Sequence, residues 1–238
     1  VTGVVPIALN RACKLTGFFL GEDKEYIGIM RIHEKVDLDK INKIIKEKFL
    51  GIIKQTPPVK SRVKRQERER EVKRFEILEQ DEGEKDLLFI AEVQGGTYIR
   101  KLIDDLGKEI GGAHMLELRR IRAGIFSEEC EEFVNLYDFE KAVDLYLDEK
   151  DEKLLRKILI PAEEALKEIF PVVEVKKESV KNLLTGKPIR DGDLKNKNIK
   201  LKDELVNIFN DNQFIGIYKV INEGEIFAKP EFVLQPIR

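Results

Sequence analysis

GGTYIRKLIDDLGKEIGGAHMLELRRIR, residues 95–122, is the stretch that decides how this chain folds. It follows the apolar run LLFIAEV, which predicts a strand, and it opens with the helical pattern TYIRKLIDDLGKEI. Gly95 and Gly96 let the chain turn tightly where a side chain would collide, and Thr97 is the expected N-cap of the helix. Arg100 then lies in the first turn, where its guanidinium can pair with a carboxylate or a phosphate. The alternative is a solvated arginine on a surface helix.

Composition limits the class of protein. A chain of 238 residues with 42% hydrophobic residues can form one large or two small cores, which excludes disorder. It has no apolar run as long as a membrane span and no signal peptide pattern, so we expect a cytoplasmic protein. Cys13 and Cys130 lie far apart without metal-ligand spacing, and we expect neither a metal nor a cofactor. A charged fraction of 37%, rich in Lys and Glu, and the absence of Trp fit a thermophile.

Positive charge is concentrated although the net charge is only −2. Eight basic and three acidic residues between positions 60 and 74 give that stretch a charge of +5, which leaves −7 for the rest. Such clustering is typical of phosphate recognition, whereas the alternative is a solvated, salt-bridged surface. The prolines at 57 and 58 and the run LRRIR favour RNA. The candidate RNA-binding residues are Lys60, Arg62, Lys64, Arg65, Arg119, Arg120 and Lys187.

Apolar spacing predicts the remaining elements. Asp37 is the expected N-cap of an amphipathic helix that ends at Phe49. Pro161 should start the last helix of the first region. We expect strands at 24–33, 75–80, 87–93 and 116–123, and helices at 5–15, 138–147, 152–158 and 162–169. After about Pro171 the pattern changes to short strands at 172–175, 205–210, 214–220 and 225–229 with a helix at 178–184. An α+β region followed by a small β-barrel is the predicted architecture.

Several segments, in order, resemble the TruB and dyskerin family of pseudouridine synthases. They are VTGVVPIAL at 1–9, KEYIGIMRIH at 24–33, QTPPVKSRVKR at 55–65, the stretch 95–122 and the helices between 136 and 166. The resemblance implies a mixed antiparallel-sheet catalytic domain over residues 1–170, incomplete at its N-terminus, and a PUA RNA-binding barrel over 171–238. It also implies conversion of uridine to pseudouridine in rRNA or tRNA by the catalytic subunit of an archaeal H/ACA ribonucleoprotein. Its partners would be guide RNA, substrate RNA and small proteins.

The resemblance also implies roles for individual residues. Arg100 would keep a nucleophilic aspartate ionised, and Tyr26 would stack on the flipped base and help to remove its proton. Tyr98 would line the pocket and Leu118 would close it. Without the resemblance, Tyr26, Tyr98 and Leu118 are ordinary packing residues. His33 and His114 are structural, and Asp104 and Asp105 belong to the helix surface.

Two departures from the family pattern matter. The family's aspartate would fall three residues before Val1, so this chain lacks the nucleophile, and we expect an incomplete sequence that is inactive alone. The turn GGAH at 111–114 is one residue short. Three other interpretations stay open. They are a guide-independent tRNA T-loop enzyme, a non-catalytic RNA-binding remnant, and a split enzyme whose aspartate lies on another polypeptide.

Overall fold

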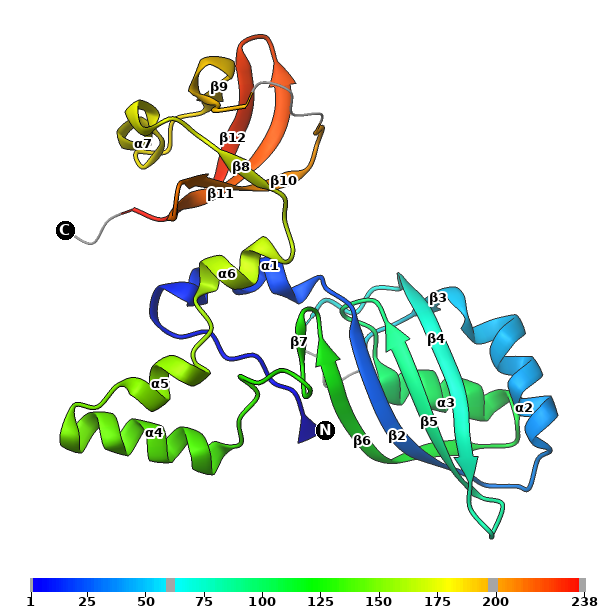
Figure 1. Cartoon of the computed structure of the whole chain (residues 1–238). Coiled ribbons are helices and arrows are strands. Elements are labelled where there is room, and N and C mark those ends of the chain that lie inside the picture. The colour runs from blue at the N-terminus through cyan, green and yellow to red at the C-terminus, as the bar shows by residue number, and fades with distance from the viewer. Residues whose placement is uncertain (1, 59–62, 197–200, 236–238) are drawn as a thin grey trace. The chain divides into compact units, whose positions relative to one another are not determined.

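A computed structural model describes residues 2–58, 63–196 and 201–235 (Figure 1). The chain divides into two compact units, Val1–Ile158 and Leu159–Arg238, which we describe separately. The expected boundary after residue 170 concerns family domains and stays a prediction. No helix in the described ranges is long and apolar enough to cross a membrane.

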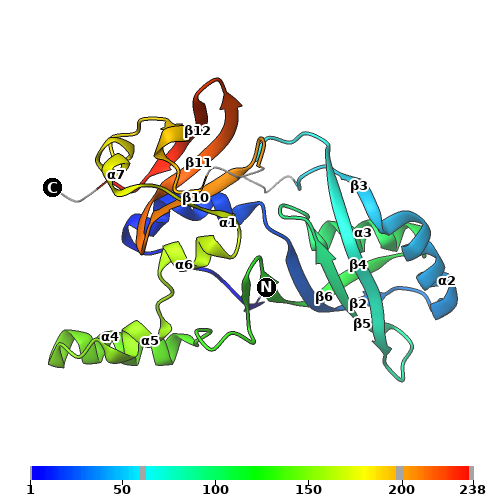
Figure 2. The ribbon, with the colours of Figure 1, turned by 45° about the horizontal axis from the view of Figure 1, so that its top comes forward.

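The larger unit is built on a seven-stranded mixed sheet with the order β1-β6-β2-β5-β4-β3, in which β7 pairs with β6. Strand β1 is parallel to β6, and the other pairs are antiparallel. Helices α2 and α3 lie on one side of this sheet (Figures 1 and 2). The strands are β1 (Thr2–Gly3), β2 (Lys24–Ile32), β3 (Gly51–Gln55), β4 (Arg68–Gln80), β5 (Asp86–Val93), β6 (Ala113–Ala123) and β7 (Phe126–Ser127).

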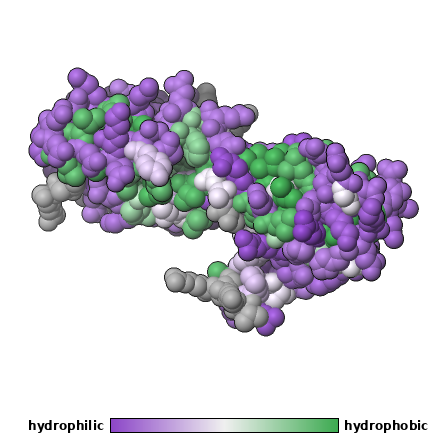
Figure 3. All heavy atoms as spheres, turned by 90° about the horizontal axis from the view of Figure 1, so that it is seen from below, coloured by the Kyte–Doolittle hydropathy of each residue, from purple (hydrophilic) through white to green (hydrophobic). Residues whose placement is uncertain are grey.

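Alternation along the strands explains why one face of this sheet is buried. In β5, Leu87, Phe89, Ala91 and Val93 are buried and the residues between them are only partly covered. Helix α3 (Ile99–Glu109) packs its apolar stripe, Leu102, Ile103 and Leu106, into the same core. Helix α2 (Leu38–Ile44) and the π-helical turn Ile45–Phe49 complete it. Seen from below, the surface is mostly hydrophilic, with patches of apolar residues between the polar ones (Figure 3).

The predicted cap of α2 is confirmed, and the predicted cap of α3 is wrong by one residue. The Asp37 carboxylate accepts a hydrogen bond from Asp39 N at 3.1 Å. At α3 the N-cap is Tyr98, because the helix begins one residue later than expected, and the Thr97 hydroxyl donates back to Gln94 O at 2.7 Å. Arg100 nevertheless lies in the first turn, as predicted.

Three expectations for the first half of the chain need correction. The helix expected at 5–15 is instead a 3-10 turn at Asn10–Leu15 followed by α1 (Thr16–Leu20). Strand β3 is an element that the apolar spacing did not predict. Strand β4 begins at Arg68, and its charged start alternates without an apolar pattern because it pairs with the edge strand β3. Half of the basic stretch therefore belongs to a strand. Lys60 and Arg62 lie outside the described residues.

Two helices follow the large sheet. Helix α4 (Leu136–Glu149) is capped by Asn135, whose side-chain oxygen accepts from Asp138 N at 3.0 Å. Helix α5 (Lys153–Ile158) packs against it. Both confirm the predicted helices within two residues at their ends, the usual uncertainty in placing a helix boundary.

The smaller unit holds a five-stranded sheet with the order β8-β10-β11-β12-β9. Its strands are β8 (Val172–Glu174), β9 (Ile189–Arg190), β10 (Leu205–Asn210), β11 (Gln213–Glu223) and β12 (Ile226–Val233). Pro161 precedes α6 (Ala162–Lys167), and α7 is Lys177–Leu183. Asn207 is fully buried and its amide donates to Leu166 O and Phe170 O at 2.7 and 2.9 Å, which ties α6 to the sheet. Closure into the expected barrel stays a prediction.

Candidate active site

The corner between β5 and α3 is built on two glycines. A Cβ on Gly95 would lie 2.6–2.9 Å from the carbonyl oxygens of residues 20, 21 and 22, so only glycine lets that turn pack against the corner. Gly96 has φ +87°, a conformation that L side chains rarely adopt. The chain then enters α3 with Arg100 exposed, and the Arg100 guanidinium forms no hydrogen bond or ion pair with the described residues. Its guanidinium is therefore free to meet a ligand.

Strand register brings Tyr26 and Leu118 to the face covered by α3. Residues directly opposite in antiparallel strands point to the same face. Tyr26 pairs with Ala91 of the core, and Gly28, on the same face as Tyr26, pairs with Leu118. Leu118 is 8% exposed and Tyr26 is partly buried against the core. The first residue of β2 pairs with the last residue of β5. Tyr26 therefore lies near the end of these strands, on the side of the sheet's end from which the chain continues into α3.

Lys24, a residue that no sequence pattern singles out, lies at the start of the same strand. Its ammonium donates to Leu20 O at 2.8 Å and to Glu22 O, the two ends of the turn that packs on Gly95. Burial lowers the pKa of Lys24, and the neighbouring Arg120 guanidinium lowers it further. Lys24 therefore fixes the turn opposite the corner. A lysine followed by an alternating strand carries no signal for this contact.

Asp104 and Asp105 are paired on the surface of α3, as expected. Lys108 lies 3.2 Å from Asp104 and 2.7 Å from Asp105, and Lys101 also pairs with both. The hydrogen bond from Lys108 lowers the pKa of Asp104, and the bond to Asp105 raises the pKa of Lys108. Both carboxylates are therefore engaged in ion pairs along α3, and we assign them no role in the candidate site.

The arginines of β6 have separate partners. Arg119 pairs with Glu128 at 2.7 Å, and Arg120 Nε donates to Val4 O at 2.7 Å. Arg122 pairs with Glu92 at 2.7 Å and with Glu25 at 3.6 Å. Arg119 remains exposed enough to meet a phosphate, whereas Arg120 holds the segment that follows β1.

The other predicted basic residues lie at the surface. Lys64 and Arg65 are exposed and lie just before β4, within residues 63–67, which form no helix or strand. In the smaller unit, the Lys187 ammonium donates to Asn182 Oδ1 at 3.1 Å. The space at Gly186, where φ is +86°, is open, because a Cβ there would meet nothing within 4 Å.

Two further residues at the corner were missed by the sequence patterns. The Gln55 side chain, 4% exposed, makes two hydrogen bonds with the main chain of Tyr98. Arg70 lies against Gly96, where a Cβ would be 3.3 Å from its Nε and Nη2 atoms, and its buried Nε has no partner. The segment QTPPVKSRVKR contained the first of these, but nothing in it indicates a partner 43 residues further along the chain.

The histidines meet one another. His33 Nε2 and His114 Nδ1 are 2.9 Å apart, across the ends of β2 and β6, which fits the structural role expected of them. No group of three or more His, Cys, Asp or Glu in the described part of the chain could hold a metal ion.

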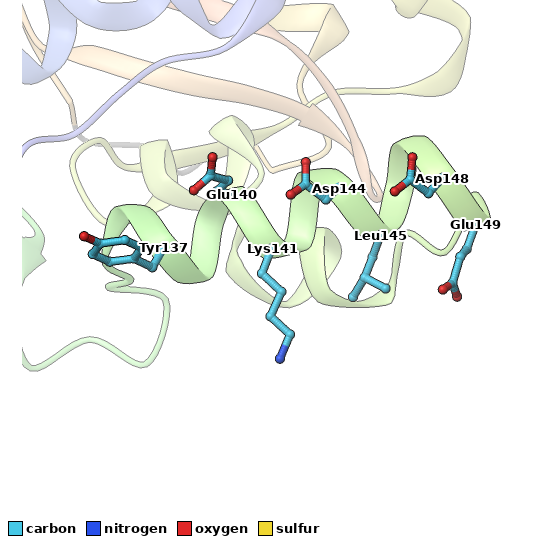
Figure 4. A pocket seen from close by; sticks show the side chains of 7 residues that line it. All are labelled: Tyr137, Glu140, Lys141, Asp144, Leu145, Asp148 and Glu149. Carbon is cyan, nitrogen blue, oxygen red and sulfur yellow. The ribbon is translucent and has the colours of Figure 1, made fainter.

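Two surface depressions in the described part of the chain lie away from the corner between β5 and α3. One of about 350 Å³ follows a single side of α4 and is lined by Tyr137, Glu140, Lys141, Asp144, Leu145, Asp148 and Glu149 (Figure 4). Another, of about 220 Å³, is lined by His33 and by residues between 104 and 113. Neither is lined by Tyr26, Tyr98, Arg100 or Leu118.

Two family models and several known proteins match this chain. Residues 1–99 match the family model for the N-terminal domain of TruB family pseudouridylate synthases, and residues 100–167 match the model for the tRNA pseudouridylate synthase B C-terminal domain. A "Probable tRNA pseudouridine synthase B" of Korarchaeum cryptofilum is 42% identical over 80% of this chain and 57% of its own length. The protein of the same name from Archaeoglobus fulgidus is 38% identical over 94% of this chain and 68% of its own length.

Solved structures agree. A chain of a Cbf5-Nop10-Gar1 complex superposes with a TM-score of 0.85 and 34% identity over 98% of this chain and 73% of its own length. A chain from an H/ACA RNP bound to a substrate RNA containing 2'-deoxyuridine gives a TM-score of 0.81 and 31% identity, over 96% of this chain and 71% of its own length. The chain spans little more than half the length of the first curated relatives that it matches.

Proposed function

Since this chain belongs to the TruB family of pseudouridine synthases, we propose that it is the catalytic part of an RNA pseudouridine synthase guided by H/ACA RNA. The observation that carries the proposal is Arg100 in the first turn of α3, whose guanidinium has no partner among the described residues, at the end of the sheet where Tyr26 and Leu118 share a face. Such a corner offers a fixed cation and an apolar platform to a base that has been flipped out of its strand.

The reaction is an isomerisation. The bond between the ribose and uracil N1 breaks, the base turns, a bond forms between the ribose and uracil C5, and the C5 proton is lost while N1 gains one. Arg100 keeps the nucleophilic carboxylate ionised by pairing with it. Tyr26 stacks on the uracil and helps to remove the C5 proton. Tyr98 lines the pocket, and Leu118 closes it with an apolar side chain.

The nucleophile itself is an aspartate that, in the family pattern, precedes the residue corresponding to Val1. We propose that this chain alone is inactive and that activity needs an aspartate-bearing segment, from the same polypeptide or from another. Intact mass and N-terminal sequencing of the protein from its native source test this point. A mass above 27.6 kDa with an aspartate ahead of Val1 supports a longer polypeptide.

RNA is the proposed substrate and guide. Lys64 and Arg65 on the large unit, and Lys187 beside the open Gly186 on the small one, supply exposed cations for phosphates. We propose that residues 171–238 form a PUA domain that holds RNA, and that small H/ACA proteins bind the catalytic unit. The structural neighbours, from a Cbf5-Nop10-Gar1 complex and a substrate-bound H/ACA RNP, support this choice.

A second candidate is a guide-independent enzyme for tRNA, which the names of the archaeal relatives favour. The experiment that separates the two measures uridine conversion in a tRNA transcript and in an rRNA fragment, with and without a complementary guide RNA. Conversion only with the guide supports the first proposal. Conversion of the bare tRNA transcript supports the second, and RNA binding without conversion by either would leave a non-catalytic RNA-binding protein.

A further inference from the structure

Gln55 ends β3 and reaches across to the first turn of α3. Its Nε2 donates to Tyr98 O at 3.3 Å, and its Oε1 accepts from Tyr98 N at 3.0 Å. Among the described residues of the larger unit it is the one buried polar or charged side chain. A polar group is kept in an apolar core only when its hydrogen bonds are satisfied, so this amide is committed to one partner.

The hydrogen-bonding partner of Gln55, Tyr98, lies at the start of α3. Tyr98 is the N-cap of α3, and no side chain caps this helix start in the usual way. Tyr98 O accepts from Leu102 N, the first hydrogen bond of the helix, as well as from Gln55. Two hydrogen bonds to one residue fix both its position and its orientation. Arg100 is only two residues away, so the direction in which its side chain leaves the helix depends on this contact.

We propose that Gln55 is a positioning residue for the reaction: it holds the start of α3 so that Arg100 and Tyr98 meet the uridine in a productive geometry. This inference rests on the proposed function. Gln55 is also followed directly by Thr56, Pro57 and Pro58, where the chain leaves β3 toward the basic segment.

Two substitutions test the role. Gln55→Ala removes both hydrogen bonds. Gln55→Glu keeps the shape, but a carboxylate cannot donate to Tyr98 O, whereas a protonated carboxyl can, and burial raises the pKa of such a group. Gln94→Ala is the matched control: this amide lies at the same corner, but its side-chain oxygen accepts from Glu71 N at 3.3 Å instead of bonding Tyr98.

Three quantities are measured on the full-length gene product. They are amide hydrogen exchange at residues 97–102, the single-turnover rate at saturating RNA, and the affinity for the same RNA, a transcript with tritium at uracil C5. For Gln55→Ala we expect faster local exchange and a rate lowered roughly 10- to 100-fold, with affinity unchanged within about twofold. Gln55→Glu should behave like the alanine variant at high pH and recover toward the unaltered protein as pH falls. Gln94→Ala should match the unaltered protein.

Other results would overturn the role. An unchanged rate in Gln55→Ala would do so, as would a loss that follows RNA affinity or global unfolding without faster exchange at 97–102. Failure of Gln55→Glu to recover at low pH would also contradict it, and this variant decides the matter if the alanine variant does not fold. If the unaltered protein converts no uridine, the proposed function fails and the positioning role fails with it. If it converts uridine and Gln55→Ala does so equally well, only the positioning role is refuted.

Discussion

Substitution of Gly95 by alanine should open the corner on which the candidate site depends. The added methyl would lie 2.6, 2.8 and 2.9 Å from three main-chain oxygens of residues 20–22, where ordinary contact begins at 3.4 Å. The closest oxygen must therefore retreat by about 0.8 Å to reach ordinary contact, and overpacking of this kind costs about 1–3 kcal/mol. The lower entropy of the unfolded chain offsets about 0.4–1 kcal/mol. We expect a net loss of roughly 1–2 kcal/mol in the free energy of unfolding.

Thermal unfolding followed by circular dichroism measures this loss. For a protein of this size the expected fall in Tm is about 2–4 °C per kcal/mol, which gives roughly 2–8 °C in total. Gly17→Ala, in α1, is the control, because a Cβ there meets nothing within 4 Å, and its Tm should stay the same or rise. A Gly95→Ala variant as stable as the unaltered protein would refute the close packing of the turn against the corner. So would an equal fall in both variants.

Three further predictions concern charge and protonation. Arg100→Lys keeps the charge but removes the paired hydrogen bonds, so the single-turnover rate should fall about 10- to 100-fold with RNA affinity unchanged; an equal fall in affinity would contradict this. Replacing Lys64 and Arg65 by alanine should lower the slope of log affinity against log salt by about one for each phosphate that these side chains neutralise, and an unchanged slope would remove them from the RNA interface. Burial raises the pKa of Tyr218 to about 12, above its ordinary value of 10.0. Its contribution to stability is therefore complete below pH 10 and disappears as pH rises toward 12, and chemical unfolding across that range should show a decline that Tyr218→Phe lacks.

The sequence predicted the elements whose signals are local. The alternation of β2 and the start of α3 were visible in neighbouring residues, as was the cap at Asp37. The start of β4 was not, because its charged residues pair with an edge strand that has no apolar period of its own. The cap at Thr97 was misplaced by one residue because the helix begins after Tyr98, and the sequence does not show that the Thr97 hydroxyl bonds back to Gln94 O.

The residues of the candidate site likewise fall into those that the sequence indicates and those that only the structure reveals. Arg100 could be chosen from its place after a strand and two glycines, and Tyr26 from its family motif. Gln55 and Arg70 could not, because their partners lie far away in sequence and become neighbours only when β3 and β4 pair beside the corner. A buried amide or guanidinium has no sequence pattern of its own. Its structural role depends on the main-chain groups that the tertiary structure places beside it.

The release of tritium from RNA labelled at uracil C5 tests the central claim most directly, because forming the new carbon bond expels that atom. The protein from its native source, in which mass and N-terminal sequencing have located the aspartate-bearing segment, is incubated with guide and substrate RNA. We expect tritium release at the uridine that the guide selects, and no such release with Arg100→Ala in the recombinant protein. RNA binding without tritium release, in a preparation that contains the aspartate, would contradict the assignment of this corner as a pseudouridine synthase site.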